Sequence, residues 1–277
     1  MDKKILLVND LPGYGRMALT AMMPILTHLH YDVYTLPTAI VANALDYERK
    51  HILETTEFME NTLSLWHDSR ISYDAVVTGF VASQKQSDIL TKWAMSQDHA
   101  RPLFFVDPVI GDKGQYYKGI DASFLPYVKA LAGVSDYFIP NYTEACFLTG
   151  RPCTDTVLSS KELLELLESL RELTPKAILV TSVKTKDSDV VIGYDHQRKT
   201  YFQLPYSLIP VHFPGSGDAF MAIFAGQILR EHNMETAAIL AMESTHNLIA
   251  ANQDQKDRNN GLPIEKCLDL VEEIRVM

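Results

Sequence analysis

The stretch Pro214-Gly215-Ser216-Gly217-Asp218-Ala219-Phe220 runs directly into an apolar segment at residues 221–229. Pro214 disfavours a helical conformation for Phe213, so a helix can begin only beyond the proline. Two glycines around a serine let the backbone approach a bound group closely, and the first amides of a helix have no partner within it. The stretch therefore predicts an anion-binding site at the start of a helix.

Asp218 is the unusual residue in this stretch, because a carboxylate beside a bound phosphate repels it unless the carboxylate has a chemical task. A general base that takes a proton from an attacking hydroxyl group has such a task. The structural alternative is a plain turn whose aspartate caps the helix. The other motifs of the chain must decide between these interpretations.

The bulk properties limit the class of protein. The chain has 277 residues, of which 47% are hydrophobic, so it can bury a full core. Because no linker is apparent, we expect a single domain over residues 1–277. The formal net charge is -10 and no basic block interrupts it, which argues against nucleic acid and anionic membranes as partners.

The first residues of the chain and its cysteine pattern indicate a cytoplasmic protein. The apolar run at residues 5–8 is too short for a signal peptide, and no later segment approaches membrane-spanning length. The three cysteines, Cys146, Cys153 and Cys267, are unevenly spaced and odd in number. That pattern argues against a disulfide framework and against a structural zinc site.

Short apolar runs that end in small or polar residues alternate with amphipathic patterns. We expect strands at 5–8, 33–36, 75–78, 103–106, 137–139 and 178–180, and helices at 17–29, 50–67, 84–95 and 161–173. Further along, we expect a hairpin of 190–194 with 200–204 and closing helices at 235–251 and 264–276. This alternation is typical of an α/β fold with a mostly parallel sheet covered on both faces. In such folds ligands bind beyond the carboxyl ends of the strands.

Polar residues follow three strands in the second half of the chain. Asp107 and Asp112 lie in one loop and offer oxygen ligands of the kind that Mg²⁺ prefers, although a simple Asp-Pro turn explains them too. Asn141 and Glu144 follow the next strand, where Thr143 as a helix cap with Glu144 in the first turn is the structural alternative. The hydroxyls of Thr181-Ser182 follow another strand and are ordinary at turns.

The order of these motifs favours a common function. Cation ligands, phosphate donors and a base are the parts needed for phosphoryl transfer from a nucleotide to an alcohol. The chain has no Gly-x-x-x-x-Gly-Lys-Ser/Thr segment, which argues against a P-loop enzyme.

These residues carry a family resemblance. The segments 107–112, 140–145, 180–182 and 215–218 resemble the ordered motifs of the ribokinase-like superfamily, and most closely those of pyridoxal kinases. The similarity spans nearly the whole chain. Three further sets resemble the segments that line the vitamin pocket of pyridoxal kinases: residues 36–39, Asn43 with Tyr47, and residues 78–80.

The resemblance implies a three-layer sandwich and a role for each motif. Asp218 would take the proton of the substrate hydroxymethyl group, and the amides of Gly215, Ser216 and Gly217 would receive the transferring phosphoryl group. Asp107 and Glu144 would hold Mg²⁺, partly through water. The residues implied for ATP are Asn141, Thr181, Ser182, Asp112 and Tyr116, and those implied for the vitamin are Asn9, Thr38, Asn43 and Phe80.

Two positions depart from the pattern of the family. Many pyridoxal kinases have serine where this chain has Asn9 and tyrosine where it has Phe80. An amide can replace a hydroxyl as donor or acceptor, and phenylalanine keeps the stacking surface without the phenolic group.

The resemblance implies phosphorylation of pyridoxal, pyridoxine and pyridoxamine with ATP. A hydroxymethylpyrimidine kinase is the nearest alternative, but its members often have cysteine in place of Asp218. A non-catalytic vitamin or nucleotide binder is the alternative from another class, against which the intact Asp218 argues. The resemblance also implies a homodimer and leaves open whether a monovalent cation such as K⁺ assists.

Overall fold

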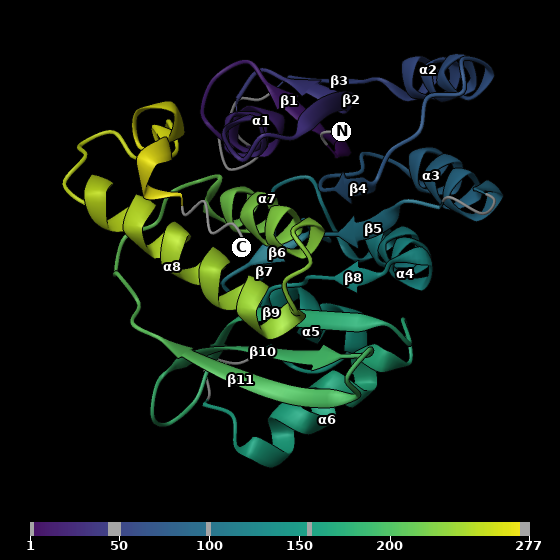
Figure 1. Cartoon of the computed structure of the whole chain (residues 1–277). Helices are drawn as coiled ribbons and strands as arrows, with labels where there is room; N and C mark the ends of the chain where they lie inside the picture. Colours follow the sequence, from purple (N-terminus) through teal and green to yellow (C-terminus); the bar gives the residue numbers. More distant parts are fainter. Residues whose placement is uncertain (1–2, 44–50, 98–100, 154–156, 272–277) are drawn as a thin grey trace. The chain divides into compact units, whose positions relative to one another are not determined.

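The computed structural model describes residues 3–43, 51–97, 101–153 and 157–271. The chain divides into two compact units. Unit 1 comprises Met1–Ala82, Ala100–Pro102 and Ile209–Met277, and unit 2 comprises Ser83–His99 and Leu103–Leu208. Figure 1 gives the element labels.

Unit 1 is built on four neighbouring strands, in the order β4-β1-β2-β3. Its strands are β1 (Lys4–Pro12), β2 (Asp32–Val41), β3 (Ile52–Glu54) and β4 (Ala75–Thr78). Strand β1 runs parallel to both β2 and β4, and β3 is antiparallel to β2. The register of β1 with β2 shifts between Asn9 and Leu11, so the regular pairing is interrupted directly after Asn9.

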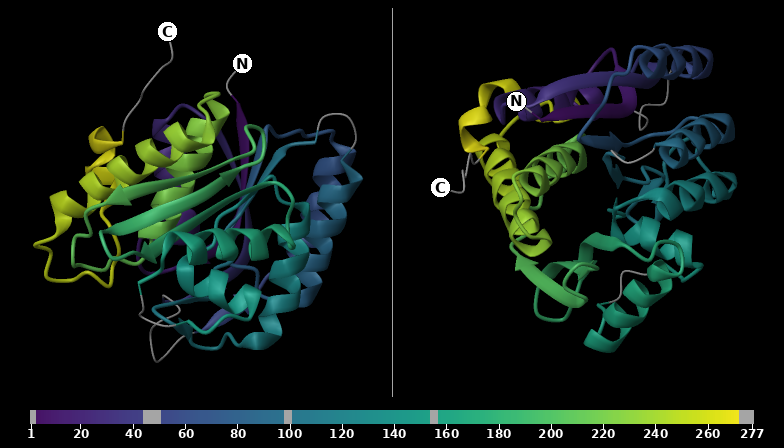
Figure 2. Two further views of the ribbon diagram at one scale, coloured as in Figure 1. Left: turned by 90° about the horizontal axis from the view of Figure 1, so that it is seen from below. Right: turned by 45° about the vertical axis from the view of Figure 1, so that its right-hand side comes forward.

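The helices of unit 1 come from both ends of the chain. They are α1 (Ala18–His28), α2 (Thr56–Asp68), α7 (Ser216–Leu229) and α8 (Met234–Asn252), followed by 3₁₀ turns at Ile264–Lys266 and Leu268–Leu270. Helix α7 packs against α1, β4 and α8, and α8 runs beside it in all views (Figures 1 and 2). Every α7 residue from Ala219 onward is buried, which explains why its sequence is apolar on all sides.

Unit 2 contains the strand order β11-β10-β9-β8-β5 and a separate hairpin of β6 with β7. Its strands are β5 (Leu103–Val106), β6 (Gly111–Asp112), β7 (Gln115–Tyr116), β8 (Tyr137–Phe138), β9 (Ala177–Lys184), β10 (Asp189–Asp195) and β11 (Thr200–Tyr206). Strands β5, β8 and β9 are parallel neighbours, and β10 is antiparallel to β9 and β11. The predicted hairpin is thus confirmed.

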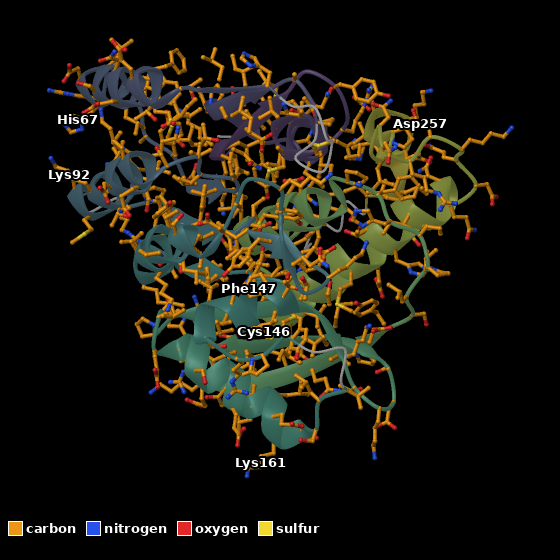
Figure 3. All side chains as sticks on the ribbon, turned by 180° about the vertical axis from the view of Figure 1, so that it is seen from behind. His67, Lys92, Cys146, Phe147, Lys161 and Asp257 are labelled. Atoms are coloured by element: carbon orange, nitrogen blue, oxygen red, sulfur yellow. The ribbon has the colours of Figure 1, made fainter. Side chains whose placement is uncertain are left out.

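The helices of unit 2 are α3 (Gln84–Ser96), α4 (Leu125–Val134), α5 (Tyr142–Thr149) and α6 (Ser160–Arg171), with a 3₁₀ turn at Ala122–Phe124. Helices α3 and α4 pack side by side (Figure 2). Helix α6 turns Leu163, Leu166, Leu167 and Leu170 inward, which is the periodicity that predicted it. Figure 3 labels Lys161 near its first turn and Cys146 and Phe147 on α5.

Several predicted boundaries are wrong. The helix expected over 50–67 begins at Thr56, because residues 52–54 pair with β2 as strand β3. Strand β2 continues through Pro37 to Val41, and β9 continues to Lys184, so Thr181 and Ser182 lie within a strand rather than after it. The helix expected over 264–276 is replaced by the two 3₁₀ turns as far as Leu270, and residues 272–276 lie outside the described part of the chain.

No helix within the described ranges is long and apolar enough to span a membrane. The predicted single domain over 1–277 stays a prediction.

Candidate active site

The glycine-rich stretch forms the predicted turn at the start of α7. Gly215 is the residue before the helix and has a φ of +84°, a conformation that favours glycine. A Cβ atom at Gly215 would lie 2.1 Å from the carbonyl oxygen of Arg16, so no larger residue fits there. Gly261, with a φ of +75°, approaches the same oxygen, because a Cβ atom there would lie 2.4 Å from it. Gly261 was not expected at the site, since it lies in a polar loop without any recognisable motif.

The amides at this turn are only partly used. Ser216 donates its N–H to Phe213 O at 3.3 Å, and Ala219 donates to Gly215 O at 2.9 Å. Within the described residues, the amides of Gly215 and Gly217 have no acceptor. The first turn of α7 therefore retains donors for an anion, and the helix dipole favours a negative charge at this end.

The carboxylate of Asp218 is held by two donors from other elements. Its Oδ2 atom accepts the N–H of Ala18 at 2.8 Å, and its Oδ1 atom accepts from Asn9 Nδ2 at 3.2 Å. The N-cap residue of α7 is Gly215, which has no side chain, so Asp218 is not the capping aspartate of the structural alternative. Burial raises the pKa of Asp218, while the bonds from Ala18 and Asn9 lower it.

Ala18 was not recognised as part of this arrangement. It is the first residue of α1 and has a φ of +47°, which is uncommon for a residue with a Cβ atom. Such strained conformations concentrate at functional sites, because the surrounding structure must hold them. Here the conformation directs an N–H group at Asp218. No sequence pattern signals a left-handed alanine.

Asn9 within β1, Thr38 within β2 and Phe80, two residues after β4, are brought together. Asn9 Oδ1 accepts the N–H of Phe80 at 2.8 Å, and the Thr38 hydroxyl donates to Phe80 O at 2.7 Å. All three side chains are buried. Asn43 is half-buried, and Tyr47 lies outside the described residues.

Asp10 is a second buried carboxyl group in unit 1, and no sequence motif singles it out. It is 7% exposed, and burial together with the charge of Asp218 raises its pKa to about 7. Two carboxyl groups close to each other disfavour double ionisation. The ionisation of Asp10 near neutral pH therefore depends on the charge of Asp218.

In unit 2, Asn141 and Glu144 form a capping box at the start of α5. Asn141 Oδ1 accepts the N–H of Glu144 at 3.0 Å, and Glu144 Oε2 accepts the N–H of Asn141 at 2.9 Å. The helix cap is thus Asn141 and not Thr143, whose hydroxyl accepts the N–H of Gly114 at 2.9 Å instead. The expected structural role of Thr143 is wrong in this respect.

Glu144 also holds the loop that follows β5. Its Oε1 atom accepts N–H groups from Ile110 at 2.9 Å and Gly111 at 3.5 Å, and Asn141 Nδ2 donates to Gly111 O at 2.8 Å. Glu144 is 1% exposed, and this burial raises its pKa to about 7 against the effect of the backbone bonds. The carboxylate thus joins the first turn of α5 to the hairpin loop.

The remaining predicted residues of unit 2 lie around this junction. Asp107 Oδ1 accepts the N–H of Val109 at 3.4 Å, in a loop where Val109 has a φ of +46°. Thr181 forms a parallel bridge with Asn141, with its N–H donated to Pro140 O at 3.1 Å. The other residues predicted to contact ATP are Asp112, Tyr116 and Ser182. Asp112 accepts the N–H of Lys113 at 2.8 Å, and the ring of Tyr116 stacks on that of Phe147 with 4.1 Å between the ring centroids. Ser182 is exposed and has a φ of +60°.

No group of three or more His, Cys, Asp or Glu side chains with metal-binding geometry is present among the described residues. Two sets of predicted residues are thus assembled. Asp218, residues 215–217, Asn9, Thr38 and Phe80 lie in unit 1. Asp107, Asp112, Asn141, Glu144 and Thr181 lie in unit 2.

Comparison with known proteins shows the family to which this chain belongs. Pyridoxal kinase PdxY of Leifsonia xyli is 26% identical over 92% of this chain and 91% of its own. A Bacteroides thetaiotaomicron protein whose name refers to phosphomethylpyrimidine kinase was solved in two crystal forms. One form is 30% identical, with a TM-score of 0.90 over 99% of this chain and 96% of its own.

The second form, which contains pyridoxal, is 29% identical, with a TM-score of 0.92 over 100% of this chain and 98% of its own. Pyridoxal kinase of Lactobacillus plantarum is 25% identical, with a TM-score of 0.87 over 97% of this chain and 96% of its own. These likenesses confirm the predicted α/β class with a mostly parallel sheet flanked by helices. The family model for phosphomethylpyrimidine kinase matches residues 25–262, so the chain belongs to the phosphomethylpyrimidine kinase family.

Proposed function

We propose that this protein is a pyridoxal kinase, which transfers the γ-phosphoryl group of ATP to the 5′-hydroxymethyl group of pyridoxal. The products are pyridoxal 5′-phosphate and ADP, and pyridoxine and pyridoxamine are further substrates. The observation that carries the proposal is the Asp218 carboxylate, oriented by Ala18 and Asn9 beside the open amides of the first turn of α7. The names of the curated relatives support the choice of vitamin.

In the proposed reaction Asp218 accepts the proton of the substrate hydroxyl. The hydroxyl oxygen forms a bond to the γ-phosphorus atom as the bond from that phosphorus to the β-γ bridging oxygen breaks, and ADP leaves with the electron pair. The amides of Gly215 and Gly217, which have no acceptor in the part of the chain that the structure describes, would receive the negative charge of the transferring group. Ser216 contributes its amide only if the bond to Phe213 O opens.

The nucleotide is assigned to the motifs of unit 2. Asn141, Thr181 and Ser182 would contact phosphates, and Asp112 and Tyr116 would belong to the loop beside the triphosphate. The capping box and the bonds from Glu144 support this assignment, because they fix the loop after β5 to the start of α5. Positioning is the main requirement of phosphoryl transfer, since the protein itself does little covalent chemistry.

Mg²⁺ bound with ATP would neutralise charge on the phosphates. Asp107 is partly exposed, so its carboxylate suits a hard cation. Glu144 is poorly suited to bind Mg²⁺ directly, because both of its oxygens already accept backbone N–H groups and the residue is only 1% exposed. We therefore assign Asp107 as the ligand and Glu144 as a partner that acts through water. Assistance by K⁺ stays a proposal.

The vitamin is assigned to Thr38, Asn43 and Phe80, and Asn9 accepts the backbone N–H of Phe80. The buried Phe80 ring offers a stacking surface, and Thr38 fixes the backbone of Phe80. Several curated relatives are named pyridoxal kinases, so the hydroxymethylpyrimidine kinase alternative is not favoured, although the matching family model is named for phosphomethylpyrimidine kinase. A cytoplasmic location stays a prediction from the sequence.

The proposal is tested with purified protein, ATP and MgCl₂ and a set of acceptors: pyridoxal, pyridoxine, pyridoxamine, hydroxymethylpyrimidine and ribose. We expect ADP to form with all three vitamers, and we expect the acceptor with the highest kcat/KM of the five to be one of these vitamers. A higher kcat/KM for hydroxymethylpyrimidine than for the three vitamers would mean that the protein is a hydroxymethylpyrimidine kinase instead. Binding of ATP without turnover of any acceptor would favour the non-catalytic binder.

A further inference from the structure

The amide of Asn9 has only one orientation that satisfies its neighbours. The backbone N–H groups of Phe80 and Asp10 both point at one end of the amide, at 2.8 and 3.0 Å. A peptide nitrogen can only donate, so the atom at that end must be the oxygen. The NH₂ group is thereby directed at the carboxylate of Asp218, 3.2 Å away.

The packing around Asn9 leaves its amide no room to rotate. The side chain is 1% exposed. A Cβ atom at Gly79 would lie 2.3 Å from Asn9 Nδ2, so the amide occupies the space that only a glycine leaves open. On another side, Nδ2 lies 3.7 Å from Met22 Sδ.

Asp218 therefore receives one fixed donor on each oxygen. Ala18 N–H holds Oδ2, and Asn9 holds Oδ1. Two donors from different elements determine the plane of the carboxylate, and each oxygen keeps a lone pair for a further proton. A base oriented in this way needs no reorganisation when the substrate hydroxyl arrives.

We propose that Asn9 is a positioning residue, which orients the carboxylate of Asp218 for proton transfer and does not hold the ring of the substrate. The inference deepens the proposed kinase function and rests on it for its kinetic test. It gives Asn9 a different role from that of the pocket residues Thr38 and Phe80.

The first test replaces Asn9 by leucine, which has a similar shape and no hydrogen-bonding group. Asn252→Leu is the matched control, because Asn252 is also a buried amide of unit 1 and donates to Leu248 O at 2.8 Å within α8. We expect N9L to lower kcat by roughly 10- to 100-fold with KM for the acceptor within about twofold, as expected for a misoriented catalytic group. N252L should keep the kcat of the wild type.

The second test does not depend on turnover. Carbon-13 labelling of aspartate allows the carboxyl group of Asp218 to be titrated by NMR, with D218N used for assignment. Loss of the Asn9 donor should shift the Asp218 titration to higher pH, because that bond favours the charged form. N252L should leave it unchanged.

Asp10 is the ionisable neighbour that must be followed in the same spectra, since its charge state depends on Asp218. Other ionisable groups lie on the elements packed against Asp218 and α7. They are Lys4 of β1, Arg16 before α1, His28 of α1, and Glu235, Glu243 and His246 of α8.

The outcomes separate the inference from the proposed function. A raised KM with nearly unchanged kcat in N9L would place the role of Asn9 in substrate binding, directly or through Phe80, and overturn the inference. An unshifted Asp218 titration would overturn it as well. If the wild type phosphorylates none of the acceptors but the titration shifts, the kinase proposal fails and the positioning role stands. If N9L does not fold, N9D serves instead in the kinetic test alone, because it keeps an acceptor for Phe80 and Asp10 but cannot donate to Asp218 when ionised, whereas its negative charge would by itself raise the pKa of Asp218.

Discussion

Asp218 and Glu144 are both carboxyl groups in helix first turns, but their surroundings give them different capacities. Asp218 accepts one bond on each oxygen and is partly exposed. Glu144 accepts three backbone N–H groups and is almost fully buried. A carboxylate can exchange protons with a substrate only while it retains a free and accessible lone pair. These surroundings favour Asp218 as the base, and they favour Glu144 as the carboxylate that fixes the loop after β5 and reaches Mg²⁺ only through water.

Replacing Asp218 by asparagine should remove most of the activity. The substitution preserves the size of the side chain but eliminates the proton acceptor, so we expect kcat to fall roughly 10²- to 10⁴-fold. ATP affinity should stay within about twofold of the wild-type value, which isothermal calorimetry can measure. Asp257→Asn, at an exposed carboxylate labelled in Figure 3, is the control. A D218N enzyme with normal kcat would remove Asp218 from the mechanism.

Asp10 should make the folded protein less stable as the pH rises. Its pKa is about 7 in the folded state and 3.8 ordinarily, so the folded state binds the proton more tightly. The free energy of unfolding therefore falls between about pH 4 and pH 7 as the buried group ionises. Asp10→Asn removes this cost and should be more stable than wild type at pH 8, by on the order of 2–4 kcal/mol.

At pH 4.5 the advantage of D10N should be small, because Asp10 is protonated there in the folded wild type. Urea denaturation of both proteins at pH 4.5 and pH 8 measures the difference. An equal advantage at the two pH values would mean that ionisation of Asp10 is not responsible.

At the scale of elements, the sequence predicted the types of most helices and strands, and the errors have identifiable causes. Periodicity located α3, α6 and the hairpin β10–β11 within a few residues. It did not locate β3, because residues 52–54 are exposed and owe their strand conformation to pairing with β2. Pro37 suggested an end to β2, yet the strand continues to Val41. Pairing between distant segments is not encoded in any local pattern.

The candidate site could be predicted from the sequence only where motifs mark it. Asp218 and Asn141 stand in recognisable segments, and the structure gives both of them defined partners. The residues around them are harder to recognise in the sequence. Ala18 contacts Asp218 through its backbone N–H, and Gly261 lets the carbonyl oxygen of Arg16 approach because it has no Cβ atom. Neither property depends on a side chain with recognisable chemistry.

The capping box of α5 should matter for both stability and nucleotide binding. Asn141→Ala removes the N-cap and the bond from Nδ2 to Gly111 O, so we expect a loss of about 1–2 kcal/mol in the free energy of unfolding and a raised KM for ATP. Ser159→Ala is the matched control, since Ser159 forms the same kind of box at α6. It should lower stability by about 1 kcal/mol.

Urea denaturation and the dependence of rate on ATP concentration measure the two effects. A raised KM for ATP in S159A as well would mean that general destabilisation, and not the loop joined to Asn141, changes nucleotide binding.

At the scale of the whole molecule, the family match covers residues from both units. Residues 25–262 include β4 and α7 of unit 1 and all of unit 2. The solved Bacteroides structures extend over 99% and 100% of the chain. The family match and the solved structures thus extend over both units, and a single kinase domain over residues 1–277 stays a proposal.

A homodimer is the last property proposed for the whole molecule, and the edge of the unit 1 strand order supports it. Ile40 of β2 pairs directly with Leu53 of β3, so their side chains share one face of the sheet, and they are 43% and 56% exposed. An edge strand with exposed apolar residues is open to pairing with another chain. We expect Ile40→Glu combined with Leu53→Lys to convert a dimer into a monomer in sedimentation-velocity experiments. Met95→Lys, at an exposed apolar residue of α3, is the control and should leave the dimer intact. A monomeric wild type would refute the proposed dimer. A dimer that persists in the double variant would exclude this sheet edge as the interface.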